Sequence, residues 1–404
     1  MSAAGDESLD LDQSEGLGEE LPLLLDLVRR FVRRDIWLWE KRIDANATRL
    51  PPAVFDELHQ RAAEFGLEHL MAPRGDCFAP AMDLPDRERA RIVEEIAQHR
   101  AGLFYPAYGL FDPDPPAQLY AATDEQRRAF LEPLANRRAR CFRGLDDPDL
   151  SDLPTDGVRA RALRRGSEWM LDGTKIFVAD AEDADFGLVY ANTEWSPGER
   201  VGVSLLVVET DRVGFQRWRA WPTIASGRDT MELNLSAVKL PECNLLGEPS
   251  AGPVFDNWLV LRRRMFAAAQ ITGIASAAQD IARGAVWSRS ENGVSLAHAE
   301  RARLALADNE IAVAAARQLY LAAADSSDIG KALRVPALAA RVFAVDAATA
   351  VTERTIRLHG PAGASTDLPL ERWARELQWL NLANGGTDRQ RLAIAGELTS
   401  TFKK

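Results

Sequence analysis

The spacing of apolar residues changes twice along the chain, and these changes divide it into three parts. From residue 20 to 137, apolar positions recur every three or four residues, which predicts helices. From 138 to 250 the apolar runs are short and often alternate, with Gly, Asp or Pro between them, as is typical of β-strands. The helical period returns over residues 251–404. We therefore expect helices, then strands, then a helical bundle.

The first part shows several helix boundaries. An apolar face runs from Leu21 to Ile36, with arginines on the opposite face. Pro51 and Pro52 begin the next predicted helix, which ends at Gly66, and another covers 84–100. Thr123 is a candidate N-cap, because Gln126 stands three positions later and completes a capping box.

The middle part predicts a small β-barrel or sandwich, since short strands follow one another at close spacing. The expected strands are 139–145, 157–164, 167–171, 174–179, 186–193, 201–208, 213–218 and 231–237.

The last part predicts helices over 254–289, 296–326, 334–359 and 385–400. Their alanine-rich surfaces favour close packing in a bundle. Glycine breaks occur at Gly360 and Gly363 and again at Gly385-Gly386. Glycine allows close backbone approach to a ligand, and helix starts offer free N–H groups to anions. The two breaks are either loops lining one site or ordinary helix connections.

Charge and composition exclude several classes of partner. Lys and Arg number 49 against 60 acids, a formal net charge of −11, which argues against nucleic acid or an anionic membrane as partner. Three scattered cysteines indicate no disulfide framework and a reducing compartment. Five scattered histidines lack metal-ligand spacing, so we expect no metal.

Residues 1–19 are acidic and polar, which predicts a disordered tail, and no apolar run suggests a spanning helix. We expect a cytoplasmic protein.

The stretch from Thr355 to Leu398 resembles the C-terminal end of the acyl-CoA dehydrogenase family. There a loop Q-x-x-G-G-x-G-Y-T precedes acidic-x-P-x-E-R, then Y-E-G-T and Q-R-x-x-x-A-x-x-L. The match keeps one register without a gap. Its residues here are Arg357, Gly360, Pro361, Gly363, Ser365, Asp367, Pro369, Glu371, Arg372, Arg375, Gly385, Gln390, Arg391, Ala395 and Leu398.

Other segments extend the resemblance over about residues 20–400. They include TDEQRRAFLEPLAN, GSEWMLDGTKIFVAD and ELNLSAVKLPECNLLGEPSAG. The resemblance implies a mainly α, α+β fold: an N-terminal helical domain (20–137), a middle β-barrel domain (138–250) and a C-terminal four-helix bundle (251–404). It also implies an oligomer, either a homodimer or homotetramer or a heteromer with a homologue.

In this family, FAD lies between the β-domain and the bundle, and a glutamate removes a proton from an acyl thioester before hydride passes to the flavin. Asn384 stands where the glutamate most often lies, and Arg263 or a neighbour stands at the alternative position. Neither an amide nor a guanidinium can act as this base. Asn384, Arg263, Asp146 and Asp147 remain candidate polar groups for a different reaction.

Most positions that would contact FAD also depart from the family pattern. Phe177 replaces the stacking tryptophan, Ala179 replaces the threonine near flavin N5, and Gly386 replaces the threonine after the glutamate. Acids near Pro148 add negative charge where the flavin would lie. The candidate residues for binding the cofactor, some retained from the family pattern and some altered, are Ser151, Phe177, Ala179, Arg289, Arg357, Gly360 and Gly386.

Three hypotheses stay open. In the first hypothesis, the chain is an atypical enzyme of a bacterial biosynthetic pathway. It acts on an acyl thioester, carried by CoA or a carrier protein, and binds FAD weakly or unusually. Alternatively, it is a flavin-free, redox-neutral enzyme that catalyses cyclisation, elimination or isomerisation in the vacated cavity. In the third, it is a non-catalytic partner subunit of an active homologue.

Structural interpretations also apply to several of these residues. The Arg262–Arg264 run is typical of a solvated helix face with one salt-bridged member. His359 is interpreted as a packed or capping histidine, and Arg372 and Arg375 as members of structural ion pairs.

Overall fold

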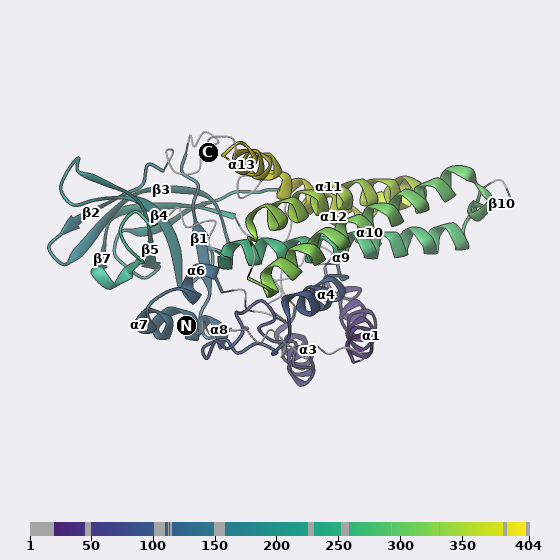
Figure 1. The fold of residues 1–404 in the computed structure, drawn as a ribbon, viewed down its shortest axis with the longest axis horizontal. Coiled ribbons are helices and arrows are strands. Elements are labelled where there is room, and N and C mark those ends of the chain that lie inside the picture. The colour runs from purple at the N-terminus through teal and green to yellow at the C-terminus, as the bar shows by residue number, and fades with distance from the viewer. Residues whose placement is uncertain are drawn as a thin grey trace, which may run out of the picture.

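The computed structural model describes residues 20–44, 50–100, 110–111, 113, 115–148, 158–224, 230–251, 258–291, 293–330, 332–382 and 386–400. The predicted order of helices, strands and helices is confirmed. The sheet and the C-terminal bundle lie end to end, and the N-terminal helices lie along one side of both (Figure 1). The predicted disordered tail, 1–19, is outside the described residues.

The N-terminal helices bury one face each against the rest of the molecule. They are α1 (Leu21–Phe31), continued by a π-helical turn (Val32–Ile36) and α2 (Trp37–Glu40), then α3 (Pro52–Glu64), α4 (Asp86–Ile96), α6 (Ala117–Tyr120), α7 (Asp124–Gln126), a second π-helical segment (Arg127–Leu131) and α8 (Glu132–Ala135). The predicted capping box at Thr123 is confirmed, because its side chain accepts from Gln126 N while the Gln126 side chain accepts from Thr123 N.

The middle domain is one eight-stranded sheet. Its strands are β1 (Cys141–Gly144), β2 (Arg161–Arg165), β3 (Glu168–Ala179), β4 (Phe186–Glu194), β5 (Arg200–Glu209), β6 (Phe215–Ala220), β7 (Thr230–Pro241) and β8 (Leu245–Leu246). The order is β6-β7-β3-β2-β4-β5-β8, with β1 parallel to β4.

Two details of the predicted strands were wrong. The expected strands 167–171 and 174–179 form the single strand β3, which passes through Gly173 with a shift of register against β7. A Cβ at Gly173 would lie 2.7 Å from the Cα of Ala160, so the sheet needs glycine there. Strand β8 was not expected, because two leucines after a turn carry no periodic pattern.

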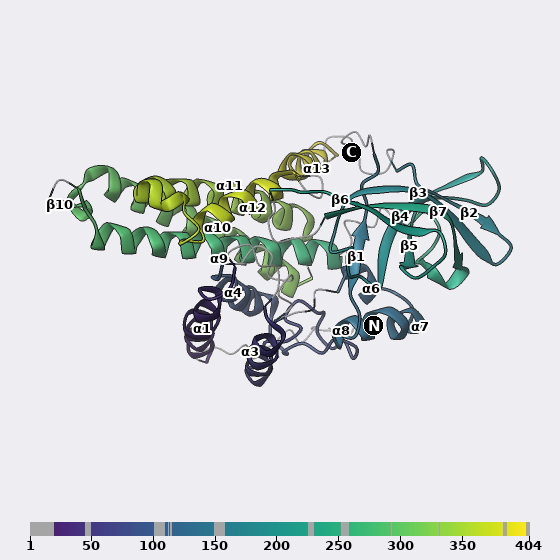
Figure 2. The same cartoon turned by 180° about the vertical axis from the view of Figure 1, so that it is seen from behind.

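The C-terminal helices are α9 (Trp258–Ser288), α10 (Glu300–Asp328), α11 (Arg334–His359), α12 (Leu370–Leu382) and α13 (Gly386–Ser400). A short hairpin, β9 (Ser290–Glu291) with β10 (Val294–Ser295), lies between α9 and α10. In both views α13 lies between the sheet and the long helices (Figures 1 and 2).

One stretch, Arg334–Ala364, is long and apolar enough by length and composition to cross a membrane. The expectation that no such run exists was therefore wrong. Of its most apolar window of 18 residues, a share of 61% is buried inside the molecule. Its apolar residues pack within the bundle, which explains the composition.

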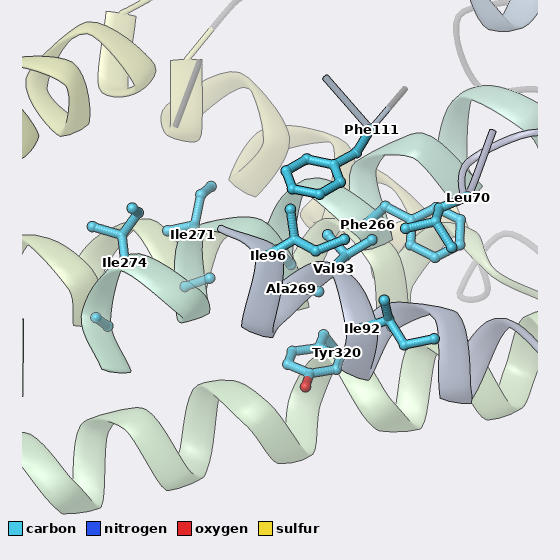
Figure 3. Packing of buried hydrophobic residues seen from close by; sticks show 14 of the residues in the cluster. Leu70, Ile92, Val93, Ile96, Phe111, Phe266, Ala269, Ile271, Ile274 and Tyr320 are labelled. Atoms are coloured by element: carbon cyan, nitrogen blue, oxygen red, sulfur yellow. The ribbon is translucent and has the colours of Figure 1, made fainter. Parts of the chain in front are cut away.

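The largest core joins the N-terminal helices to the bundle. Ile92, Val93 and Ile96 of α4 belong to one buried cluster with Phe266 of α9 and Tyr320 of α10 (Figure 3). A Cβ at Gly273 of α9 would meet the carbonyl oxygen of Glu94 at 2.2 Å. The helices therefore approach each other so closely that only glycine fits at this position.

Candidate functional site

The rim of the sheet meets the C-terminal helices where the sequence expected a site. The turn after β1 is fastened to β3, because Ile176 N donates to the Asp146 carbonyl at 2.8 Å. The segment after β6 reaches α12, where Arg375 Nη1 lies 3.4 Å from the Ile224 carbonyl oxygen. On the helix side, Arg389 of α13 is close enough to act electrostatically on Asp146.

Asp147 is part of the structural framework of this rim. Its Oδ1 lies 2.7 Å from Lys175 Nζ, and both side chains are buried. Its Oδ2 accepts from the backbone N–H groups of Arg159 and Ala160, while Lys175 also donates to the Leu145 carbonyl at 3.0 Å. A carboxylate with these partners holds the strands together, so the structure gives Asp147 a role other than the predicted polar group of a cavity.

Asp146 is the neighbouring carboxyl and is half-buried. Burial raises its pKa, an effect that Lys175 and Arg389 oppose and that Asp147 reinforces. A carboxyl in this environment exchanges a proton closer to neutral pH than an exposed one does. Of the two predicted acids, Asp146 is the one that is not enclosed in a buried ion pair.

Phe177 and Trp221 form an aromatic pair on the rim. Their ring centroids lie 5.2 Å apart, and the Arg219 guanidinium lies 3.7 Å from the Trp221 ring centroid. Phe177 has φ +51° beside a register shift of β3, and its side chain is 43% exposed. Positive φ is costly for an aromatic residue and occurs where the surroundings impose it, often at ligand sites. The bulge turns this ring out of the sheet.

Three polar atoms near this pair are buried without a hydrogen-bond partner among the described residues. They are Trp221 Nε1, Thr223 Oγ1 and Thr230 Oγ1. Thr230 pairs with Ala179 in the β3–β7 register. Unsatisfied buried polar groups are rare and require a partner. An aromatic surface with unused donors and acceptors fits a planar ligand that also forms hydrogen bonds, and an isoalloxazine ring has that chemistry.

The predicted residues on the helices have other contacts. Arg289 Nη1 donates to the carbonyls of Leu358 and His359 at 3.2 and 2.8 Å, and so caps α11. Arg357 is exposed and paired with Glu353. Gly360, at φ +61°, has open space where a Cβ would stand, whereas a Cβ at Gly386 would meet the Asn381 carbonyl oxygen at 2.2 Å. Asn384 and Ser151 lie outside the described residues.

The interpretation of Arg262–Arg264 as a solvated helix face with one salt-bridged member was right about the salt bridge and wrong about the solvation. Arg262 is buried and donates to both carboxylate oxygens of Asp86, at 2.7 and 2.6 Å, and to the Met71 carbonyl. Arg263 and Arg264 are half-buried. The run was expected to face water because arginines seldom enter a core, but Asp86 of α4 compensates the charge.

The structural interpretations of His359, Arg372 and Arg375 are confirmed. His359 is buried, and its Nδ1 lies 2.8 Å from the Thr355 carbonyl oxygen. Arg372 pairs with Glu376 and Arg375 with Glu371, each across one helical turn. Among the residues the structure describes, no group of three or more His, Cys, Asp or Glu could hold a metal.

Sequence reasoning missed Trp221 and Lys175 at this site. Trp221 follows the end of β6, and no local pattern shows that β6 and β7 bring it beside Phe177. Lys175 could have been found, because a lysine inside an apolar strand requires a buried acid nearby.

Comparisons with known proteins place this geometry in a family. The acyl-CoA dehydrogenase C-terminal domain model matches residues 256–399, and the middle-domain model matches 149–238. The cyclohexane-1-carbonyl-CoA dehydrogenase of Geobacter metallireducens is 30% identical over 386 residues, which are 94% of this chain and 97% of the relative. The chain belongs to the acyl-CoA dehydrogenase family.

Further comparisons agree with this family. A probable acyl-CoA dehydrogenase of Bacillus subtilis is 27% identical over 391 residues, covering 95% of this chain and 98% of the relative. The butyryl-CoA dehydrogenase structure from Megasphaera elsdenii has a TM-score of 0.80 at 24% identity and covers 99% of this chain and all (100%) of that one. A structure described as the FAD complex of PigA has a TM-score of 0.81 at 17% identity and covers 99% of each chain. These two structures share the acyl-CoA dehydrogenase fold with this chain.

Proposed function

We propose that this chain is an atypical acyl-CoA dehydrogenase-family enzyme that binds FAD and acts on an acyl thioester without the family's usual glutamate base. The observation that carries the proposal is the Phe177–Trp221 pair with its unsatisfied polar neighbours. This pair supports the binding of a planar ring at the place where the sheet meets α12 and α13.

The residues that would hold FAD divide into two sets. Phe177, Trp221 and Thr230 would contact the ring, with Ala179 beside them. Arg289 adjoins the β9–β10 hairpin at the end of the bundle far from the sheet (Figure 1), so in an oligomer it would serve the diphosphate of an FAD whose ring lies on a second copy of the chain; its N–H groups besides the Nη1 that caps α11 suit that group. When bound, FAD would supply a hydride acceptor.

Asp146 is the proposed proton-exchanging group of the site. Its carboxyl is half-buried, and its pKa is raised by burial. Asp147 and Lys175 fix the turn that carries it, because their buried ion pair joins β3 to the segment before β2. The family resemblance places Asn384 at one of the two base positions and Arg263 or an immediate neighbour at the other. Neither an amide nor a guanidinium accepts the proton, so a carboxyl elsewhere is needed.

The visible absorption spectrum of the purified protein, recorded before and after adding FAD, tests the proposal. We expect about one flavin per chain after addition. Trp221→Leu should weaken FAD binding about tenfold, because a stacked aromatic contributes about 1–3 kcal/mol. Trp218→Leu is the matched control, since Trp218 is 67% exposed on the adjacent strand β6.

Measurements of thioester turnover and FAD uptake then distinguish the proposed flavoenzyme from the flavin-free alternative. Asp146→Asn should retain the flavin spectrum and lose thioester turnover by about a hundredfold or more. A protein that takes up no FAD would instead support the flavin-free alternative, which the existing contacts of Arg289 and Arg357 favour in part. Equal FAD binding by the Trp221 and Trp218 variants would refute the proposed place of the ring.

A further inference from the structure

A hollow of about 190 Å³ lies on one face of β2 and β3, beside the end of β4. Figures 1 and 2 both show β2 at the end of the sheet remote from the C-terminal helices. The hollow is larger than the roughly 150 Å³ that holds benzene and smaller than the roughly 300–1,000 Å³ of drug-sized sites, so it suits a small metabolite. Its lining side chains are Arg161, Leu163, Met170, Asp172, Glu194 and Pro197.

Two described residues of opposite charge face each other across the hollow without forming an ion pair. Arg161 of β2 and Asp172 of β3 are directly opposed in the register, and Asp172 acts electrostatically on Arg161. The Arg161 guanidinium turns instead to Glu194 of β4, whose carboxylate accepts from Nε at 2.9 Å and from Nη2 at 2.6 Å. Within the described part of the chain, Arg161 Nη1 donates to no other residue. Its N–H groups are therefore available to a ligand.

A bulge of β3 fixes the Asp172 carboxylate. Asp172 lies at the register shift of β3 against β7, and its Oδ1 accepts from Ala237 N at 2.7 Å. Ala237 has φ +50°, a conformation that is costly for alanine and occurs where the surroundings impose it. Asp172 Oδ2 accepts from none of the residues that the structure describes. The carboxylate is thus held by one oxygen and keeps the other for a ligand.

The floor between these two charges is apolar. Leu163 and Met170 are directly opposed on the same face as Arg161 and Asp172, and both are half-buried. Pro197, in the turn between β4 and β5, adds a further apolar wall. A ligand that fills the hollow therefore gains apolar contact as well as two charge-assisted hydrogen bonds.

We propose that this hollow binds a free α-amino acid with an aliphatic side chain. The ligand's carboxylate accepts from Arg161, its ammonium donates to Asp172, and its side chain covers the apolar floor. Glu194, at 1% exposure, holds the guanidinium in place for this contact. A fatty acid would leave Asp172 without a partner, an amine would leave Arg161 without one, and inorganic phosphate would leave the floor uncovered. The site requires neither FAD nor a thioester, so it stands apart from the proposed function.

Binding of leucine, compared with three compounds that each lack one of its groups, tests the inference. Isocaproate lacks the ammonium, leucinamide lacks the carboxylate, and glycine lacks the aliphatic side chain. We expect leucine to bind with a Kd of about 1 mM and to raise the thermal unfolding midpoint saturably by about 1–2 °C. Equilibrium dialysis should find one leucine per chain. The other three compounds should bind at least about tenfold more weakly, since each loses one of the three contacts.

Variants locate the binding to this hollow. Asp172→Asn keeps a side-chain oxygen for Ala237 N and should fold as wild type does, but should bind leucine at least about tenfold more weakly. Arg161→Lys keeps a cation beside Glu194 without the spare Nη1, so it should lose the preference for leucine over leucinamide. Glu168→Gln is the matched control, because Glu168 is an exposed carboxylate of the same strand that does not line the hollow. This variant should bind leucine as wild type does.

Three outcomes would overturn the inference. No saturable response to leucine would show that the hollow takes no amino acid. Equal affinities for leucine and leucinamide would show a site for amines that does not use Arg161. Equal leucine affinities of wild type and Asp172→Asn would place the binding elsewhere on the molecule.

Discussion

Glu376 has no exposed surface on α12, and its Oε1 accepts from Arg372 Nε at 2.6 Å. Its Oε2 is buried without a hydrogen-bond partner among the described residues. Burial raises the pKa of Glu376 to about 7 from the ordinary 4.5, although Arg372 opposes the shift. Arg372 and the more distant effect of Arg375 therefore do not replace the hydration that this carboxylate loses.

This environment makes stability depend on pH. The folded state holds the Glu376 proton more tightly than the unfolded state, so its stabilising contribution is complete below pH 4.5 and is lost as pH rises to about 7. The loss amounts to about 3 kcal/mol in the free energy of unfolding. Urea unfolding of wild type and Glu376→Gln between pH 5 and 8 measures it, and the variant should show a flatter profile.

Glu371→Gln is the control for that measurement, since Glu371 is also paired one turn away, with Arg375, but is partly exposed. It should follow the wild-type profile. Parallel profiles for wild type and Glu376→Gln would contradict the assignment of the pH dependence to Glu376.

At the scale of the secondary-structure element, α13 has a specific backbone requirement at its start. Gly386 has φ +59°, and a Cβ there would lie 2.2 Å from the Asn381 carbonyl oxygen at the end of α12. The first residue of α13 therefore lies against the last turn of α12, and Arg389 of the same helix acts electrostatically on Asp146. Gly386 of the second glycine break thus has to be glycine for α13 to begin at this place.

Gly386→Ala should destabilise the protein by about 1–3 kcal/mol, because it combines a strained φ with a backbone clash. It should also weaken FAD binding, since α13 would shift relative to the sheet. Gly396→Ala in the same helix is the control, because its Cβ would meet no atom within 4 Å. That substitution should be neutral or stabilise by about 0.5–1 kcal/mol. Thermal unfolding and FAD titration compare the two, and equal effects would contradict this account of Gly386.

At the scale of the whole molecule, buried ion pairs connect the N-terminal helices to the bundle. Arg262 of α9 binds Asp86 of α4, which also accepts from Ser327 of α10 at 2.7 Å. Glu94 of α4 accepts from Arg317 and Tyr320 of α10 and from Ser276 of α9. Polar contacts of this kind fix how the apolar surfaces of Figure 3 align.

Arg262→Met should cost about 3–5 kcal/mol of unfolding free energy, since it leaves the Asp86 carboxylate buried without its cation. Arg87→Met is the control one residue away from Asp86, because Arg87 and Asp325 are both about half exposed, at 48% and 51%. It should cost at most about 1 kcal/mol. Guanidinium unfolding of both variants measures the difference, and similar costs would show that the buried pair contributes little to joining the domains.

The sequence by itself determined the order of domains, most helix boundaries and the Thr123 capping box, because periodicity and caps are local properties. Family motifs also predicted the region of the site from its glycines and from Asp146 and Phe177. Only the tertiary structure decided which charges are compensated, since ion pairing depends on residues distant in sequence. It paired Asp147 with Lys175, Arg262 with Asp86 and Phe177 with Trp221. These contacts come from the packing of sheet against helix and helix against helix, which local patterns do not specify.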